Sequence, residues 1–379
     1  MTNFKQLLTK YSIKKGENSN TNTRIGDKKL PIYGGNYHVP DEEYPNFIKS
    51  YYNDVIIGNK IEYLTEKQLD VGGPLLIDLD FKFSYDLTTR LITNTHIKDI
   101  LDLYFLELNK MFQIDPEEPI NAYVFLKDNV NRVEENKITK DGIHIIIAMQ
   151  CNHNVQMILR EKVMARIEEV LDLQDFPLTN TWDEVFDEGI SKGGTNWQLY
   201  GSRKPANEDY KLVQCYIVEK DPVDREFMYN PSDINEYYNE DNFYKLSVRN
   251  KEIPFFFMNN DFADHLSKES DIKEKKTIPN SSPSIITNFE IEKYIDYAGI
   301  IDVSVLKNYE PYFKFQKASS NIGIPFQIFD DIVNKPGAGN YDKEKNKDMF
   351  NQPHNEGNKI GWKFIYTLAG ESNPEQKKI

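Results

Sequence analysis

The sequence predicts an α+β fold that is followed by a separate, small helical unit. Between residues 31 and 264, strand patterns alternate with amphipathic helices that would cover one side of a sheet. The next stretch, residues 265–284, carries charge, serine and proline with almost no apolar content, which is typical of a linker. Beyond this stretch the patterns are helical. We therefore expect two folded units.

These patterns divide the chain of 379 residues into four segments. Residues 1–30 are polar with few large apolar groups, and we expect a flexible leader there. The main α+β domain is expected over residues 31–264, the linker over 265–285 and a helical C-terminal domain over 286–379. The last segment contains no carboxylate cluster and no glycine-rich phosphate loop, so we expect no catalysis in it.

Each element of the main domain follows from the period of its apolar residues. In chain order, the sequence predicts a helix over 41–56, a strand over 72–83, a helix over 95–112, a hairpin of strands 121–127 and 142–150 with a long charged tip, a helix over 155–173, and strands over 196–202 and 211–220.

Composition excludes several classes of protein. A hydrophobic content of 39% with 13% aromatic residues is typical of a globular protein. No stretch approaches the roughly 18 apolar residues of a membrane span, and the first residues lack the core of a signal peptide. We expect no membrane partner. Cys151 and Cys215 are too few for an all-cysteine metal site or a disulfide framework, which favours a reducing, intracellular setting.

The net charge of −14 argues against a surface with general affinity for nucleic acid. A local basic channel can still bind nucleic acid within an acidic protein. Metal ions held by carboxylates would also reverse the sign of the field at a site.

Two aspartates interrupt the apolar strand GGPLLIDLDFKF. Because strand side chains alternate between faces, Asp78, Asp80 and Lys82 project to one side and the apolar residues to the other. Two carboxylates on one face can hold divalent cations, which suit phosphate substrates. Solvated charges on the outer face of a strand explain this short pattern equally well.

A second pattern, KDGIHIII, places Lys140, Gly142 and His144 on one face of the next predicted strand. A cation, a gap without a side chain and an imidazole could together hold a triphosphate, because glycine lets an anion approach the backbone. Taken alone, the pattern more often reflects a histidine that covers the end of a core strand.

The third pattern is VFDEGISKGGTNWQLYGSRKP. Asp187 ends an apolar approach, and a later strand delivers Ser202, Arg203 and Lys204. The functional interpretation is a third carboxylate for metal ions, together with a hydroxyl and cations for phosphates or template. The alternative is an ordinary hairpin with a basic tip.

Together, the order of the three patterns resembles the archaeo-eukaryotic primase superfamily. Such enzymes carry an hhhDhD motif, an SxH-type motif and a later hD motif on an RRM-like antiparallel sheet. The third pattern is the most similar, since it resembles the run D-x-G-V-Y…N-F-R-L-Y-x-S-x-K at Asp187, Gly189, Asn196, Leu199, Tyr200, Ser202 and Lys204.

The lead-in YLTEKQLDVGGPLLIDLDF looks most like the primase part of the poxvirus-type primase–helicases of large DNA viruses. The C-terminal runs FDDIVNKPGAGNYD and GWKFIYTLAGESNP resemble the helical domain that follows the primase core in such proteins. This resemblance implies an RRM-like primase core and a DNA primase or primase-polymerase that makes short primers. In a virus, the setting would be the host cytoplasm.

The resemblance also implies the site and its partners. Asp78, Asp80 and Asp187 would hold two Mg²⁺ or Mn²⁺ ions, while Lys140, His144 and Lys204 would contact the phosphates of an incoming NTP or dNTP. The template would be single-stranded DNA. A replicative helicase is expected on a separate chain or on a missing C-terminal part, because no GxxxxGK[ST] loop occurs here.

Two departures from the family pattern affect the nucleotide site. Gly142 stands where the family often has serine, so a side-chain hydroxyl is lost and a backbone N–H is expected to replace it. Thr195 and Gln198 stand where related enzymes often have arginine.

Two other functions remain open from the residues alone. A metal-dependent nuclease would use Asp78, Asp80 and Lys82 but gives no role to KxGxH. A non-catalytic replication scaffold would bind single strands by aromatic stacking, although all three acids are intact.

Overall fold

The computed structural model describes residues 3–14, 20–171, 176–263, 266, 288–302, 304–307, 309–334, 343–351 and 361–372. Contacts divide the chain into two compact units, Met1–Phe256 and Phe257–Ile379. The first unit combines helices with antiparallel sheets and the second is helical. The predicted α+β class with a helical C-terminal region is therefore confirmed.

The main sheet of the first unit is antiparallel and has the order β11-β10-β6-β8-β5, with β7 paired to β8. Its strands are β5 (Pro74–Ser84), β6 (Ile120–Leu126), β7 (Asn131–Val133), β8 (Ile138–Gln150), β10 (Lys211–Lys220) and β11 (Phe227–Ser232). The predicted hairpin is the β6–β8 pair, and its charged tip contains β7. Strand β5 lies at one end of this order, which matters for the site.

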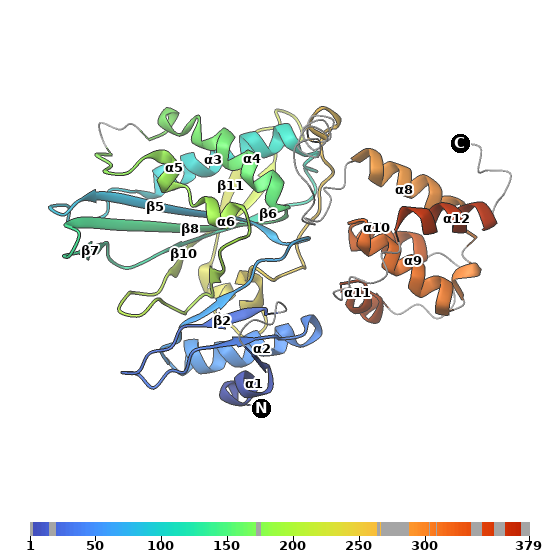
Figure 1. Ribbon diagram of the computed structural model, residues 1–379. Helices are drawn as coiled ribbons and strands as arrows, with labels where there is room; N and C mark the ends of the chain where they lie inside the picture. Colours follow the sequence, from blue (N-terminus) through green and yellow to red (C-terminus); the bar gives the residue numbers. More distant parts are fainter. Residues whose placement is uncertain are drawn as a thin grey trace, which may run out of the picture. The chain divides into compact units, whose positions relative to one another are not determined.

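Helices cover one face of the main sheet. Figure 1 shows α3 (Asn94–Met111), α4 (His153–Met164) and the short α5 (Trp182–Val185) on the same side of it. The apolar stripe of α3 is buried, and its first turn is capped by the hydroxyl of Thr93. The helix predicted over 155–173 is shorter in the structure: it ends at Met164, and η3 (Ile167–Glu169) follows.

A smaller sheet lies on the other face, with the order β1-β3-β2-β4-β9. Its strands are β1 (Ser12–Ile13), β2 (Asn22–Arg24), β3 (Gly35–Tyr37), β4 (Leu64–Glu66) and β9 (Trp197–Gln198), and it is accompanied by α1 (Phe4–Lys10), η1 (Asp41–Glu43), α2 (Tyr44–Tyr51) and η2 (Tyr52–Ile57). One buried cluster joins both sheets, because Leu76, Tyr123 and Ile146 of the main sheet pack with Phe47 and Tyr51 of α2.

The first thirty residues differ from the predicted flexible leader. Phe4, Leu7 and Leu8 of α1 are buried, and the Phe4 ring lies 5.3 Å from that of Phe47. Strand β2 pairs with both β3 and β4. The prediction was wrong because three apolar residues on one short helix are enough to anchor it, although the composition of the segment is polar.

The predicted strand over 196–202 is also shorter than expected. Only Trp197 and Gln198 pair with β4, and the chain then turns at Gly201 with φ +87°. A Cβ atom at Gly201 would lie 2.6 Å from Ile56 Cδ1. The turn therefore requires glycine. Short helices complete the first unit: α6 (Glu188–Ser191), η4 (Ile234–Tyr237) and η5 (Phe243–Leu246).

The second unit contains α8 (Asn288–Ile300), η6 (Val305–Lys307), α9 (Tyr309–Asn321), α10 (Phe326–Val333), α11 (Lys343–Asn351) and α12 (Trp362–Ser372). Aromatic rings fill its core, where Phe329 packs against Phe315 and Phe350. The predicted linker, residues 265–285, lies outside the described residues except for Leu266. Among the described helices, none combines the length and the apolar character that a membrane crossing requires.

Candidate metal and nucleotide site

Three carboxylates meet at the free edge of the main sheet. One oxygen from each of Asp78, Asp80 and Asp187 lies within 4.8 Å of the other two. Asp78 and Asp80 are on β5, where they pair across the ladder with His144 and Gly142 of β8. Leu79 and Phe81 are buried on the other side of β5, so polar and apolar side chains alternate along this strand as the sequence predicts.

Asp187 reaches the two strand aspartates from a segment that runs beside β5. Thr179 N–H donates to Lys82 O at 2.8 Å, and Asp187 N–H donates to Asp78 O at 3.0 Å. Between these contacts, the Asn180 side chain donates to Asp80 O at 2.9 Å. Asp187 is not part of a strand: it is the N-cap of α6, and its segment is held against the edge of β5 by single backbone contacts.

A buried arginine fixes this segment. Arg160 of α4 is 4% exposed, and its Nε and Nη2 donate to the carbonyl oxygen of Phe186 at 3.0 and 2.8 Å. Nη2 also donates to the carbonyl oxygen of Asp183 at 2.7 Å. The residue directly before Asp187 is therefore tied to the helical layer.

Glycine is needed two residues after Asp187. A Cβ atom at Gly189 would lie 2.5 Å from Thr195 Oγ1 and 3.0 Å from Asp187 Oδ1. The same Oδ1 accepts a hydrogen bond from Ile190 N–H at 3.2 Å. Any side chain at position 189 would therefore displace a carboxylate that its own helix orients.

The environment of Asp78 fits a bound cation. Its Oδ1 is buried and has no hydrogen-bond partner among the described residues, and His144 Nε2 lies 3.5 Å from it. Burial raises the pKa of Asp78 well above its usual range, and the charges of Asp80 and Asp187 add to this effect. A buried oxygen without a partner, surrounded by two further carboxylates, is a donor set that hard divalent cations satisfy.

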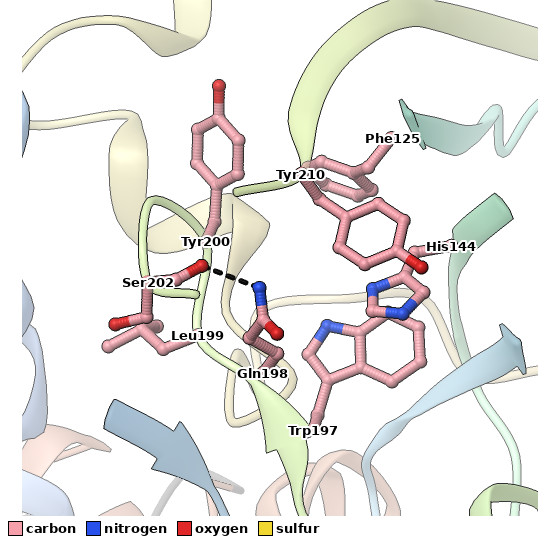
Figure 2. A pocket seen from close by; sticks show the side chains of 8 residues that line it. All are labelled: Phe125, His144, Trp197, Gln198, Leu199, Tyr200, Ser202 and Tyr210. Atoms are coloured by element: carbon pink, nitrogen blue, oxygen red, sulfur yellow. Dashed lines mark hydrogen bonds between the residues drawn. The ribbon is translucent and has the colours of Figure 1, made fainter. Parts of the chain in front are cut away.

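His144 lies beside the acids, within an aromatic stack. Figure 2 shows its ring between those of Tyr210 and Trp197, with centroid distances of 3.6 and 4.4 Å. Burial lowers the pKa of His144, and the charges of Lys127 and Lys204 lower it further. The two faces of this neutral imidazole are covered by Tyr210 and Trp197. Its edge is left to contact other groups, and Nε2 on that edge lies 3.5 Å from Asp78 Oδ1.

Two lysines set the positive charge of the site, and the sequence analysis identified only one of them. Lys204 is exposed, and its charge opposes the upward shift of the Asp78 pKa. Lys127 acts on Asp78 in the same way. Lys127 directly follows β6, where Phe125 pairs with His144, so it projects to the same face. Because Phe125 and Lys127 are two residues apart, strand alternation alone predicts that they share a face.

Lys140 and Ser202 are two further predicted nucleotide-binding residues. Lys140 is exposed and pairs across the ladder with Lys82, one same-face step beyond Gly142. Ser202 is fully buried, and its hydroxyl accepts from Leu64 N–H at 3.1 Å and lies 2.9 Å from the Tyr51 hydroxyl. This hydroxyl joins the small sheet to α2.

Arg203 and Tyr210 complete the surroundings. Arg203 is partly exposed, and its backbone N–H donates to Glu62 O at 2.9 Å, so it follows the small sheet. Tyr210 is a residue that the sequence analysis missed. It lines a small hollow, open in part to solvent, together with His144, Trp197 and Gln198 (Figure 2). His144 connects this hollow to the acidic cluster, because its Nε2 lies 3.5 Å from Asp78 Oδ1.

The comparison with known families agrees with this geometry. Residues 27–216, half of the chain, match the family described as the C962R protein N-terminal AEP domain, where AEP denotes archaeo-eukaryotic primase. The chain belongs to the archaeo-eukaryotic primase family. The matched span contains the three carboxylates as well as His144 and Tyr210. The predicted membership of the primase superfamily is thus confirmed.

One relative extends the match to large DNA viruses. The protein named "Putative helicase L207/L206" of Acanthamoeba polyphaga mimivirus is 29% identical over 213 residues, which are 56% of this chain and 21% of that protein. The chain therefore spans about a fifth of the length of this relative. This chain is thus similar to part of a much longer viral protein, and together with the family match this supports a primase-family role in replication.

Proposed function

We propose that this protein is a DNA primase or primase-polymerase that makes short primers on single-stranded DNA by nucleotidyl transfer during viral DNA replication. The observation that carries the proposal is the convergence of Asp78, Asp80 and Asp187 within 4.8 Å on a primase-family domain. The charges of Lys127 and Lys204 act on the same cluster. Anionic ligands for metal ions and cations for phosphates are thus side by side.

In this proposal the three aspartates hold one or two Mg²⁺ or Mn²⁺ ions. When bound, such ions lower the pKa of an attacking 3′-hydroxyl and stabilise the pyrophosphate leaving group. The chain itself contributes fixed groups. Asp187 is oriented by the α6 N-terminus, and His144 Nε2 lies 3.5 Å from the buried Oδ1 of Asp78.

The cations of the chain neutralise the triphosphate. Lys127 and Lys204 act closest to the acids, because their charges reach Asp78 and His144. Lys140 stands further out on the same strand face and is assigned to the outer phosphates or the template strand. Arg203 is assigned to the template, and Ser202 supports the turn that presents Arg203 and Lys204.

The nuclease alternative receives no support from the contacts. Lys82 would be its catalytic lysine, but Lys82 Nζ lies 3.7 Å from Glu184 Oε1, a carboxylate outside the acidic cluster. The scaffold alternative leaves unexplained why a buried carboxylate oxygen without a partner would be kept, since such an atom costs free energy.

A replicative helicase is the proposed partner, because the viral relative carries the word helicase in its name and is much longer than the match. The helical unit from Phe257 onward is proposed to assist initiation or to join the primase to that partner. Deleting it should leave extension of a supplied primer intact and reduce synthesis without a primer if the first role holds.

The test is incubation with an unprimed single-stranded template, NTPs or dNTPs, and Mg²⁺ or Mn²⁺. New oligomers complementary to the template support the proposal. A shortened template would instead identify a nuclease, and retardation of the template without a product would identify a scaffold.

A further inference from the structure

A tyrosine hydroxyl occupies the space beside the glycine of β8. A Cβ atom added at Gly142 would lie 2.2 Å from the Tyr210 hydroxyl oxygen and 3.4 Å from Asp80 Oδ1. The first distance is far below any van der Waals contact, so a side chain at position 142 and the present position of Tyr210 exclude each other. The phenol therefore reaches the backbone at Gly142, next to an aspartate of the acidic cluster.

Contacts on several sides fix the Tyr210 ring. It stacks on His144 with 3.6 Å between centroids and 18° between planes, and Lys127 Nζ lies 4.7 Å from its centroid. The loop before it is held by a hydrogen bond from Asn131 Nδ2 to Asn207 Oδ1 at 3.1 Å. An aromatic side chain packed in this way has little rotational freedom, so the place of its hydroxyl is set before any ligand binds.

The hydroxyl is without a partner, although the side chain is buried. Tyr210 is 7% exposed, and its hydroxyl makes no hydrogen bond within the part of the chain that the structure describes. Burial raises the pKa of Tyr210 well above its usual range, and the charges of Asp78 and Asp80 raise it further. A tyrosine hydroxyl carries a proton at neutral pH, so this group is a hydrogen-bond donor for which the described residues supply no acceptor and which a ligand or water can engage.

We infer that the Tyr210 hydroxyl is a binding group of the nucleotide site and donates a hydrogen bond to a phosphate oxygen of the bound nucleoside triphosphate. The carboxylate of Asp80 borders the same space, since its Oδ1 would lie 3.4 Å from a Cβ atom at Gly142, and bound cations would engage that carboxylate. An anionic oxygen drawn in by Lys127 and those cations would satisfy the free donor. This inference rests on the proposed function, and it adds a residue that neither motif spacing nor the charge pattern indicates.

Tyr210→Phe is the first variant, because it keeps the ring and its stack on His144 and removes one oxygen atom. We expect the KM for the nucleotide in extension of a supplied primer to rise about tenfold, which corresponds to about 1.4 kcal/mol. The melting temperature and the metal dependence should stay as in the wild type. An unchanged KM would overturn the inference.

A pair of double variants separates the hydroxyl from packing. In the Tyr210→Phe background, the atom nearest to a Cβ at position 142 is the ring carbon Cζ at 3.3 Å, so a small side chain fits there. Gly142→Ser then returns a hydroxyl to the same space, and Gly142→Ala is the matched control with a methyl group only. We expect the serine variant to bind the nucleotide at least about threefold more tightly than the alanine variant.

Equal affinities of the two double variants would overturn the inference even if Tyr210→Phe is less stable, because both carry the same background change. Affinity is measured by calorimetry with an NTP and Ca²⁺, and product formation by the wild type is scored separately. If the wild type binds nucleotide but makes no product, the proposed function fails, while the comparison of affinities still decides the role of Tyr210.

Discussion

The backbone N–H of Asp187 donates a hydrogen bond to the carbonyl oxygen of Asp78 over 3.0 Å. This contact joins the edge of β5 to a segment far along the chain and brings the two side chains into one cluster with Asp80. The candidate metal site therefore exists only when both segments have folded together. Its properties should respond to the charges in the cluster and to the groups that hold Asp187 in place.

Asp78→Asn should stabilise the metal-free protein. Three carboxylates within 4.8 Å repel one another, and Asp78 also loses hydration. We expect the free energy of unfolding in EDTA to rise by about 1 kcal/mol or more, since one pKa unit corresponds to about 1.4 kcal/mol. Denaturant titration measures this, and stabilisation by added Mn²⁺ should disappear. A loss of stability in EDTA would contradict the charge-repulsion account.

The affinity for cations should increase with pH. Because burial and the neighbouring acids raise the pKa of Asp78, protons compete with a cation where an ordinary carboxylate is already ionised. The stability of the metal-free protein depends on pH in the opposite direction. The stabilisation that protonated Asp78 provides is fully present below the unfolded pKa of about 3.9, and it is lost as the pH rises through the folded pKa.

Calorimetric titration with Mn²⁺ at several values between about pH 5.5 and about pH 8.5 checks this prediction. Asp78→Asn is the control, because it removes the carboxyl group whose pKa is raised. An affinity that does not change with pH in the wild type would show that Asp78 does not compete for protons in this range.

Lys127→Ala should weaken nucleotide binding more than Lys140→Ala. The charge of Lys127 acts on both Asp78 and His144, whereas Lys140 pairs with Lys82 further along the sheet. We expect a rise in nucleotide Kd of about tenfold for Lys127→Ala and of about threefold or less for Lys140→Ala. Both variants remove one lysine from the same face, so each controls for net charge. The reverse order would return Lys140 to the centre of the nucleotide site.

Arg160→Met should weaken cation binding without touching a ligand. Its guanidinium holds the carbonyl oxygen of Phe186, and its loss should free Asp187 from its place beside β5. We expect a loss of stability of about 3 kcal/mol and a weaker response of the melting temperature to Mn²⁺. Arg166→Met, which breaks ion pairs with Glu107 and Glu169 and does not contact the segment of Asp187, should leave the Mn²⁺ response unchanged. Equal Mn²⁺ responses in the two variants would exclude a positioning role for Arg160.

The strands that carry the site could be predicted because their patterns are local. Alternation on β5 separates Asp78 and Asp80 from Leu79, and apolar periodicity locates β6 and β8 within a few residues. The first thirty residues could not be predicted in the same way, because burial of Phe4 depends on Phe47, a partner far along the chain.

The composition of the site was predictable only in part, for a related reason. A motif identifies residues that lie close together in sequence, such as Asp78 with Asp80. Tyr210 enters the site through a loop, and only the fold places its hydroxyl against Gly142. Ser202 shows the opposite case, since a residue within a motif has its hydroxyl directed to Tyr51 and Leu64.

The most direct test of the account is template-directed synthesis by the wild type and by Asp80→Asn. Asp80 is exposed, so its replacement by an amide of the same shape should leave the fold intact, and because it removes one charge from the cluster it should not lower the melting temperature. On unprimed single-stranded DNA with Mg²⁺ or Mn²⁺, the wild type should make oligomers complementary to the template from NTPs or dNTPs. Asp80→Asn should make at least about 100-fold less product, because the cluster needs the charge. Synthesis by Asp80→Asn at the wild-type rate would contradict the account, as would a wild type that makes no product with either nucleotide set.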